Sequence, residues 1–118
     1  NRTELALDAV NAHAINQVKL KSDEMGIRLI AVVIPDGAFS SQDRRLSYLS
    51  SMRYTRTISL LHEAEIDTIN LVEEFPKKAS LKEINTQYYI QRGDGWTGHL
   101  SPLGNEELAR ILAKKICL

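Results

Sequence analysis

A histidine and an aspartate near the end of the chain have the residue types for acid–base chemistry. His99 and Asp94 lie in segment 92–102, which also contains three glycines and the only tryptophan, Trp96. Histidine exchanges protons near neutral pH, and a carboxylate bonded to one ring nitrogen leaves the other free to accept a hydroxyl proton. Glycines permit the tight turns that keep an imidazole accessible. The segment therefore predicts a general base, His99, oriented by Asp94.

The residues around and after His99 resemble the C-terminal signature of the SGNH (GDSL-type) hydrolase family. Positions 98–105 read Gly-His-Leu-Ser-Pro-Leu-Gly-Asn, and Glu-Leu-Ala follows at 107–109. In that family an Asp and a His precede a small or polar residue, Pro, any residue, Gly and His or Asn, and then a closing helix. The upstream order of helices and strands is similar along nearly the whole chain.

The resemblance implies ester hydrolysis or acyl transfer by a Ser-His-Asp mechanism, on small or carbohydrate-borne acyl esters and without a metal or organic cofactor. His99 corresponds to the family's general base and Asp94 to its orienting acid. The family spaces these as Asp-x-x-His, whereas Asp94 lies five residues before His99, so the loop is two residues longer here. Trp96 either lines the substrate cleft or covers the edge of the core.

The nucleophile of the family has no counterpart in this sequence. The family places a serine in a Gly-Asp-Ser motif, but Gly-Asp occurs here only at Gly93-Asp94. The family's oxyanion-hole Gly and Asn also precede the region that matches, and the sequence begins with Asn1 rather than Met. We therefore expect residues 1–118 to be the C-terminal portion of one SGNH hydrolase-like domain, which the upstream remainder completes with the serine. Alone, this portion should be inactive.

The elements that must position His99 alternate between helix and strand. Residues 29–34 are apolar and mostly β-branched, which is typical of an inner parallel strand buried on both faces. Alternation of this kind predicts an α/β fold, namely a three-layer α/β/α domain with a parallel, flavodoxin-like sheet of which this chain supplies the later strands. Ligands then bind at the carboxyl ends of the strands. We expect helices at 3–25 and 41–64 and from 101 onward, and strands at 27–34 and 66–72.

Local signals mark several helix ends. Gly26 fits the residue that ends a helix in the left-handed conformation. Ser80 and Glu83 have the spacing of a capping box. Ser101 is placed to cap the last helix, and Pro102 suits its first position.

Composition excludes several functional classes. The chain has 15 basic and 15 acidic residues and no formal net charge, which argues against a nucleic-acid partner. No apolar run approaches the roughly 20 residues that span a bilayer. Cys117 is the only cysteine, and no Cys/His group has zinc-ligand spacing. A different class stays open: a non-catalytic α/β module for protein contacts, either a degenerate SGNH-like domain or a receiver-like fold.

Overall fold

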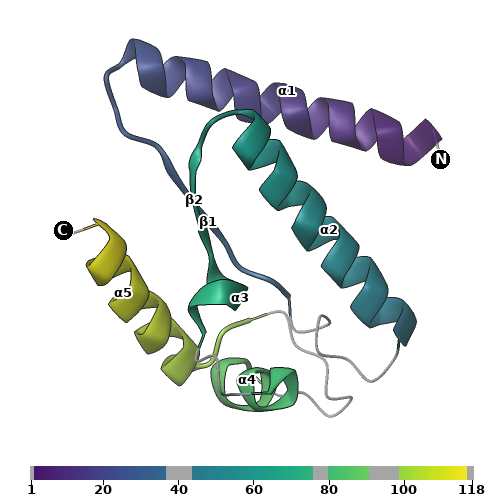
Figure 1. The fold of residues 1–118 in the computed structure, drawn as a ribbon, viewed down its shortest axis with the longest axis vertical. Coiled ribbons are helices and arrows are strands. Elements are labelled where there is room, and N and C mark those ends of the chain that lie inside the picture. Colours follow the sequence, from purple (N-terminus) through teal and green to yellow (C-terminus); the bar gives the residue numbers. More distant parts are fainter. Residues whose placement is uncertain (1, 37–43, 76–79, 91–98, 117–118) are drawn as a thin grey trace.

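The structure is a computed structural model that describes residues 2–36, 44–75, 80–90 and 99–116. These ranges form five helices and two short strands (Figure 1). In chain order the elements are α1 (Arg2–Glu24), β1 (Ile30–Val33), α2 (Arg44–Glu63), β2 (Asp67–Asn70), α3 (Leu71–Glu74), α4 (Leu81–Tyr88) and α5 (Pro102–Ile116).

The expected three-layer α/β/α fold with a flavodoxin-like sheet is wrong. In the described ranges most residues are helical, and the sheet consists of β1 and β2 alone. The two strands run parallel, with Ile30 opposite Asp67 and Val33 opposite Asn70. Alternation of helices and strands predicts that successive strands are parallel, and they are. It carries no information about how many strands share the sheet.

The burial of β1 also differs from the expectation. A strand inside a helix-covered sheet is buried on both faces, but every residue of β1 is only half-buried. Ile30 and Val32 pack against the core on one face of the strand pair. Asn70, whose side chain points away from that of its neighbour Ile69, contacts α2 on the opposite face. β2 ends at Asn70, so the residues expected to extend it begin α3 instead.

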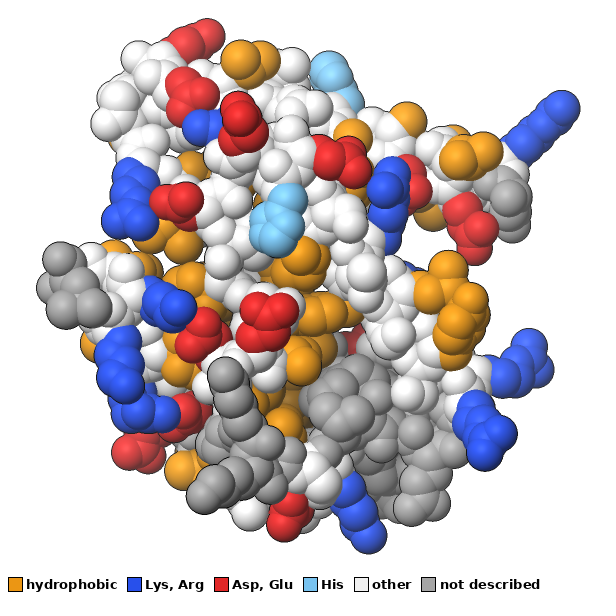
Figure 2. All heavy atoms as spheres, in the orientation of Figure 1, with side chains coloured by type: hydrophobic (Ala, Val, Ile, Leu, Met, Phe, Trp, Pro, Cys, Tyr) orange, Lys and Arg blue, Asp and Glu red, His pale blue; other side chains and the backbone are white. Residues whose placement is uncertain are grey.

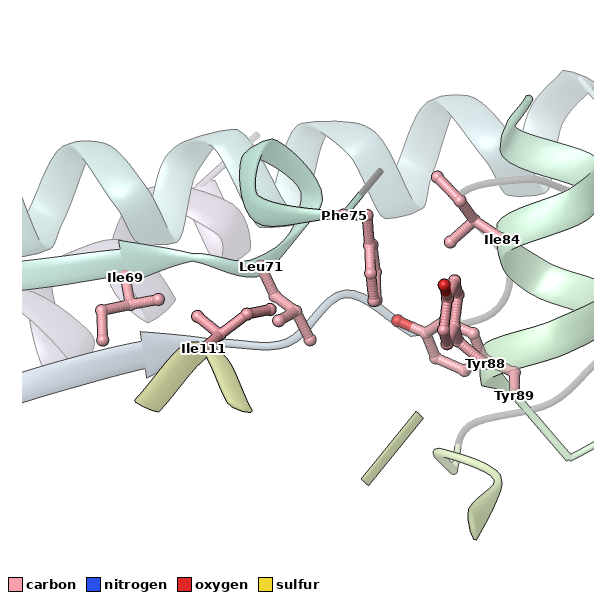
Figure 3. Packing of buried hydrophobic residues seen from close by; sticks show 7 residues of the cluster. All are labelled: Ile69, Leu71, Phe75, Ile84, Tyr88, Tyr89 and Ile111. Carbon is pink, nitrogen blue, oxygen red and sulfur yellow. The ribbon is translucent and has the colours of Figure 1, made fainter. Parts of the chain in front are cut away.

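The core joins β2 to the three C-terminal helices (Figure 3). Leu71 is fully buried at the start of α3, and Ile111 of α5 packs in the same cluster. The rings of Phe75 and Tyr88 stack with their centroids 5.0 Å apart. The cluster consists of Ile69, Leu71, Phe75, Ile84, Tyr88, Tyr89 and Ile111. It fixes α4 and α5 against the strands and so positions the segment that contains His99.

Helix α1 contributes nothing to this core. None of its residues is buried, and apolar side chains such as Leu5 and Val10 are mostly exposed. An ion pair of 2.9 Å between Asp8 and Arg56 Nε attaches α1 to α2. On the face shown in Figure 2, apolar side chains gather between α2 and α5 and charged side chains surround them.

Two helices end with the same pattern of backbone hydrogen bonds. After α1, Gly26 has a φ of 65°, and Ile27 N donates to Ser22 O at 2.9 Å. This confirms the predicted glycine stop, because a positive φ is free of strain only for glycine. After α2, Ile66 N donates to the carbonyl oxygen of the residue five positions earlier at 3.0 Å, but the residue with positive φ is Glu65, at 55°.

Glu65→Gly should therefore stabilise the protein. A non-glycine residue in the left-handed conformation costs roughly 1–2 kcal/mol, and the greater freedom of glycine in the unfolded chain offsets part of the gain. We expect the free energy of unfolding to rise by about 0.5–1 kcal/mol in urea denaturation. The control is Glu65→Ala, which removes the carboxylate but keeps Cβ, and it should show no such rise. Equal stabilities of the two variants would contradict the left-handed backbone at this position.

Candidate functional site

Polar side chains gather where the two parallel strands end. Parallel strands place their carboxyl ends at one edge of a sheet, and in α/β proteins ligands bind at that edge. Here the edge receives side chains from β2, from α2 and from the segments that follow β1 and α4. We name this group the strand-end cluster: Asp36, Ser50, Tyr54, Asn70 and Tyr89.

A serine on α2 holds the chain just after β1. Ser50 is 7% exposed, and its Oγ donates a 2.8 Å hydrogen bond to Asp36 Oδ1. A nucleophilic serine needs an adjacent base and an open approach for the substrate. Ser50 is buried and bonded directly to a carboxylate, so the pair anchors the segment that follows β1 to α2.

Tyr54 connects α2 to the ends of both strands. Its hydroxyl donates to Asn70 Oδ1 and lies 3.4 Å from the carbonyl oxygen of Val33. The Tyr54 hydroxyl oxygen also accepts a hydrogen bond from Val72 N at 3.4 Å. The last residues of β1 and β2 therefore share one phenol, which keeps the two strand ends together.

Tyr89 contacts the residues after β1 from the segment that follows α4. It is 2% exposed, and its hydroxyl donates a 2.6 Å hydrogen bond to the carbonyl oxygen of Pro35. Burial raises the pKa of Tyr89 far above its ordinary value, with smaller contributions from Tyr54 and the charge of Asp36. Burial also raises the pKa of Tyr54. Both phenols therefore stay protonated at physiological pH and act as hydrogen-bond donors.

His99 is exposed and held by its backbone. Ile90 N donates to His99 O at 2.9 Å, and Ser101 N donates to Tyr88 O at 2.8 Å. Between these two hydrogen bonds, Tyr89 and Leu100 form an antiparallel bridge. We name this pairing of residues 88–90 with residues 99–101 the His99 clamp. It holds the backbone of His99 by hydrogen bonds and leaves the His99 side chain exposed.

The Ser-Pro-x-Gly run after His99 joins the end of α4 to the start of α5. As expected, Ser101 caps α5: its Oγ accepts from Gly104 N at 3.1 Å, and it also donates to Gln87 O at 2.7 Å. Pro102 is the first residue of the helix. A Cβ on Gly104 would lie 2.1 Å from Tyr88 O, so only glycine fits against α4. The motif therefore fixes the position of the His99 clamp.

Two residues expected at the site, Asp94 and Trp96, lie outside the described residues, so their roles stay predictions. Within the described ranges, no hydrogen bond or ion pair joins a carboxylate to the His99 imidazole, and no three His, Cys, Asp or Glu side chains gather as a metal site. Sequence analysis missed Tyr54 and Tyr89. Nothing local marks them, because each acts on residues far away in the chain.

The described residues contain no membrane-spanning helix, and the comparisons with known proteins gave no match. In the part of the chain that the structure describes, no helix is long and apolar enough to cross a membrane. In comparisons with protein-family models, with curated proteins and with solved structures, the chain matches none.

Gly104→Ala should destabilise the protein although alanine is the better helix former. In an open helix the change would add up to about 1 kcal/mol of stability. Here the new methyl meets the backbone of Tyr88, and such overpacking costs about 1–3 kcal/mol. Urea denaturation should show a net loss of about 1–2 kcal/mol. Asn105→Ala, at the exposed next position, is the control and should change stability by less than about 0.5 kcal/mol. A stabilised Gly104→Ala variant would contradict the close packing.

Alkaline pH should destabilise the protein, partly through Tyr89. Its pKa in the folded state lies above the value near 10 of an unfolded tyrosine. The unfolded chain therefore loses this proton first. Ionisation of Tyr89 leaves the free energy of unfolding unchanged below about pH 10 and lowers it above that pH. Urea denaturation between about pH 8 and 11 should show a smaller fall for Tyr89→Phe than for the wild type. Tyr48→Phe, which changes an exposed ring on α2, should follow the wild type. Parallel profiles for all three proteins would contradict the buried, neutral phenol.

Proposed function

We propose that this chain supplies the general base, His99, and the orienting acid, Asp94, of a serine hydrolase or acyltransferase that acts on acyl esters. The nucleophilic serine comes from polypeptide outside these 118 residues, since none of the serines here has the Gly-Asp-Ser context. The observation that carries the proposal is the exposed His99 on a backbone held by the two hydrogen bonds of the clamp. Tyr89 links that clamp to the carboxyl end of β1.

In the proposed reaction, His99 removes the proton from the serine hydroxyl as its oxygen attacks the acyl carbonyl. Asp94 stabilises the imidazolium and holds the ring in the correct tautomer. The imidazolium then donates its proton to the leaving alcohol, which produces an acyl-serine. His99 next removes a proton from water, or from an acceptor alcohol in acyl transfer, as that oxygen attacks the acyl-serine carbonyl. The acyl–serine bond then breaks, the acyl group leaves as the carboxylic acid or the new ester, and the imidazolium returns its proton to the serine oxygen.

The substrate class follows from the family resemblance. Small acyl esters, or acyl groups carried on carbohydrates, are the proposed substrates. The proposal does not depend on a large sheet: it requires only that His99 and the strand ends keep one fixed arrangement. The core and the strand-end cluster support that arrangement.

Substitution of His99 in the intact natural protein tests the proposal. His99→Ala should lower the turnover of p-nitrophenyl acetate by about 10²–10⁴-fold, the usual contribution of a general base. His62→Ala is the matched control, because His62 is exposed near the end of α2 and away from the clamp. It should leave turnover unchanged.

A serine-directed phosphonate gives a second readout in the same protein. It should label the wild-type protein covalently and label His99→Ala far more slowly, since the serine would then lack its base. Unchanged turnover and unchanged labelling in His99→Ala would contradict the proposal. Absence of both turnover and labelling in the wild-type protein would favour the non-catalytic α/β module. Asp94→Asn tests the orienting acid separately. If His99→Ala loses turnover and Asp94→Asn keeps it, only the proposed role of Asp94 is excluded.

A further inference from the structure

Tyr89 is the point where the His99 clamp meets the strands. Its ring lies in the core beside Tyr88 (Figure 3). Its hydroxyl bonds to the carbonyl oxygen of Pro35, 54 residues earlier in the chain and just beyond the end of β1. The residue lies outside the Ser-Pro-x-Gly run.

The path from this hydroxyl to the imidazole consists of short, rigid links. Tyr89 pairs with Leu100 in the antiparallel bridge, and its neighbour Ile90 donates to His99 O. On the other side, Tyr88 accepts from Ser101 N. A rotation or shift of Tyr89 therefore moves the backbone that carries His99, because both hydrogen bonds of the clamp begin at its immediate neighbours.

We infer that Tyr89 is a positioning residue for the proposed reaction. Its hydroxyl ties the His99 clamp to the end of β1 and so fixes the backbone from which the imidazole extends. This inference rests on the proposed function. The raised pKa of the Tyr89 phenol supports the same role, since the group remains a hydrogen-bond donor over the whole range in which a histidine titrates.

Tyr89→Phe removes the hydroxyl and keeps the ring in the core. In the intact natural protein we expect kcat for p-nitrophenyl acetate to fall by about 10- to 100-fold, because small misplacements of a catalytic group cost this much. KM should change little, which separates a loss of positioning from a loss of substrate binding.

A matched variant separates positioning from a general loss of stability. Ile84→Val removes one methyl group from the same core on α4, without touching the clamp. It should lower the melting temperature but leave kcat and KM as in the wild type. If Tyr89→Phe behaves like Ile84→Val, Tyr89 has only a structural role and the inference is overturned.

Hydrogen exchange gives a readout that does not depend on activity. In the intact natural protein, the amides of Ile90 and Ser101 should exchange at least about tenfold faster in Tyr89→Phe, and Ile84→Val should show no such selective change. Unchanged exchange at both amides would overturn the inference. If His99→Ala loses turnover while Tyr89→Phe keeps it, the proposed function stands and the inference fails. If His99→Ala keeps full turnover, both fail.

Discussion

One buried hydrogen bond, from the Tyr89 hydroxyl to the Pro35 carbonyl oxygen, joins the C-terminal part of the chain to the strands. The apolar core brings α4 and α5 against β2, but apolar contacts alone do not specify a unique position. A buried phenol must find an acceptor, and this one finds it at the end of β1. The clamp and the tight contact of Gly104 with Tyr88 then determine where His99 lies.

The features that could be predicted from the sequence are those whose physical causes are local. Gly26 ends α1 because glycine alone takes a positive φ without strain, and the predicted glycine stop is confirmed. Ser80 and Glu83 form the expected capping box, and Ser101 caps α5 ahead of Pro102. Each of these signals is complete within four residues, so the rest of the chain cannot change it. The approximate positions of the main helices and of both strands could be predicted from longer apolar patterns, although β1 and β2 are shorter than expected and α3 begins at Leu71.

The features that could not be predicted depend on distant residues. The apolar run at β1 was expected to be buried on both faces, but burial depends on neighbouring elements, and the described chain provides β2 on one edge only. The three-layer sheet fails for the same reason. At the site, His99 was identified from its glycine-rich surroundings and its motif. Tyr54 and Tyr89 were not, since their partners lie 16 and 54 residues away.

The role of His99 is tested most directly by chemical rescue of His99→Ala in the intact natural protein. Free imidazole can enter a space left by a missing histidine side chain and act as the base in its place. If His99 removes the serine proton, added imidazole will restore p-nitrophenyl acetate turnover to His99→Ala in a saturable manner, beyond its background reaction with the ester and without effect on the wild type. Turnover that is undiminished in His99→Ala, or that imidazole raises no further than its background reaction, would contradict a general-base role.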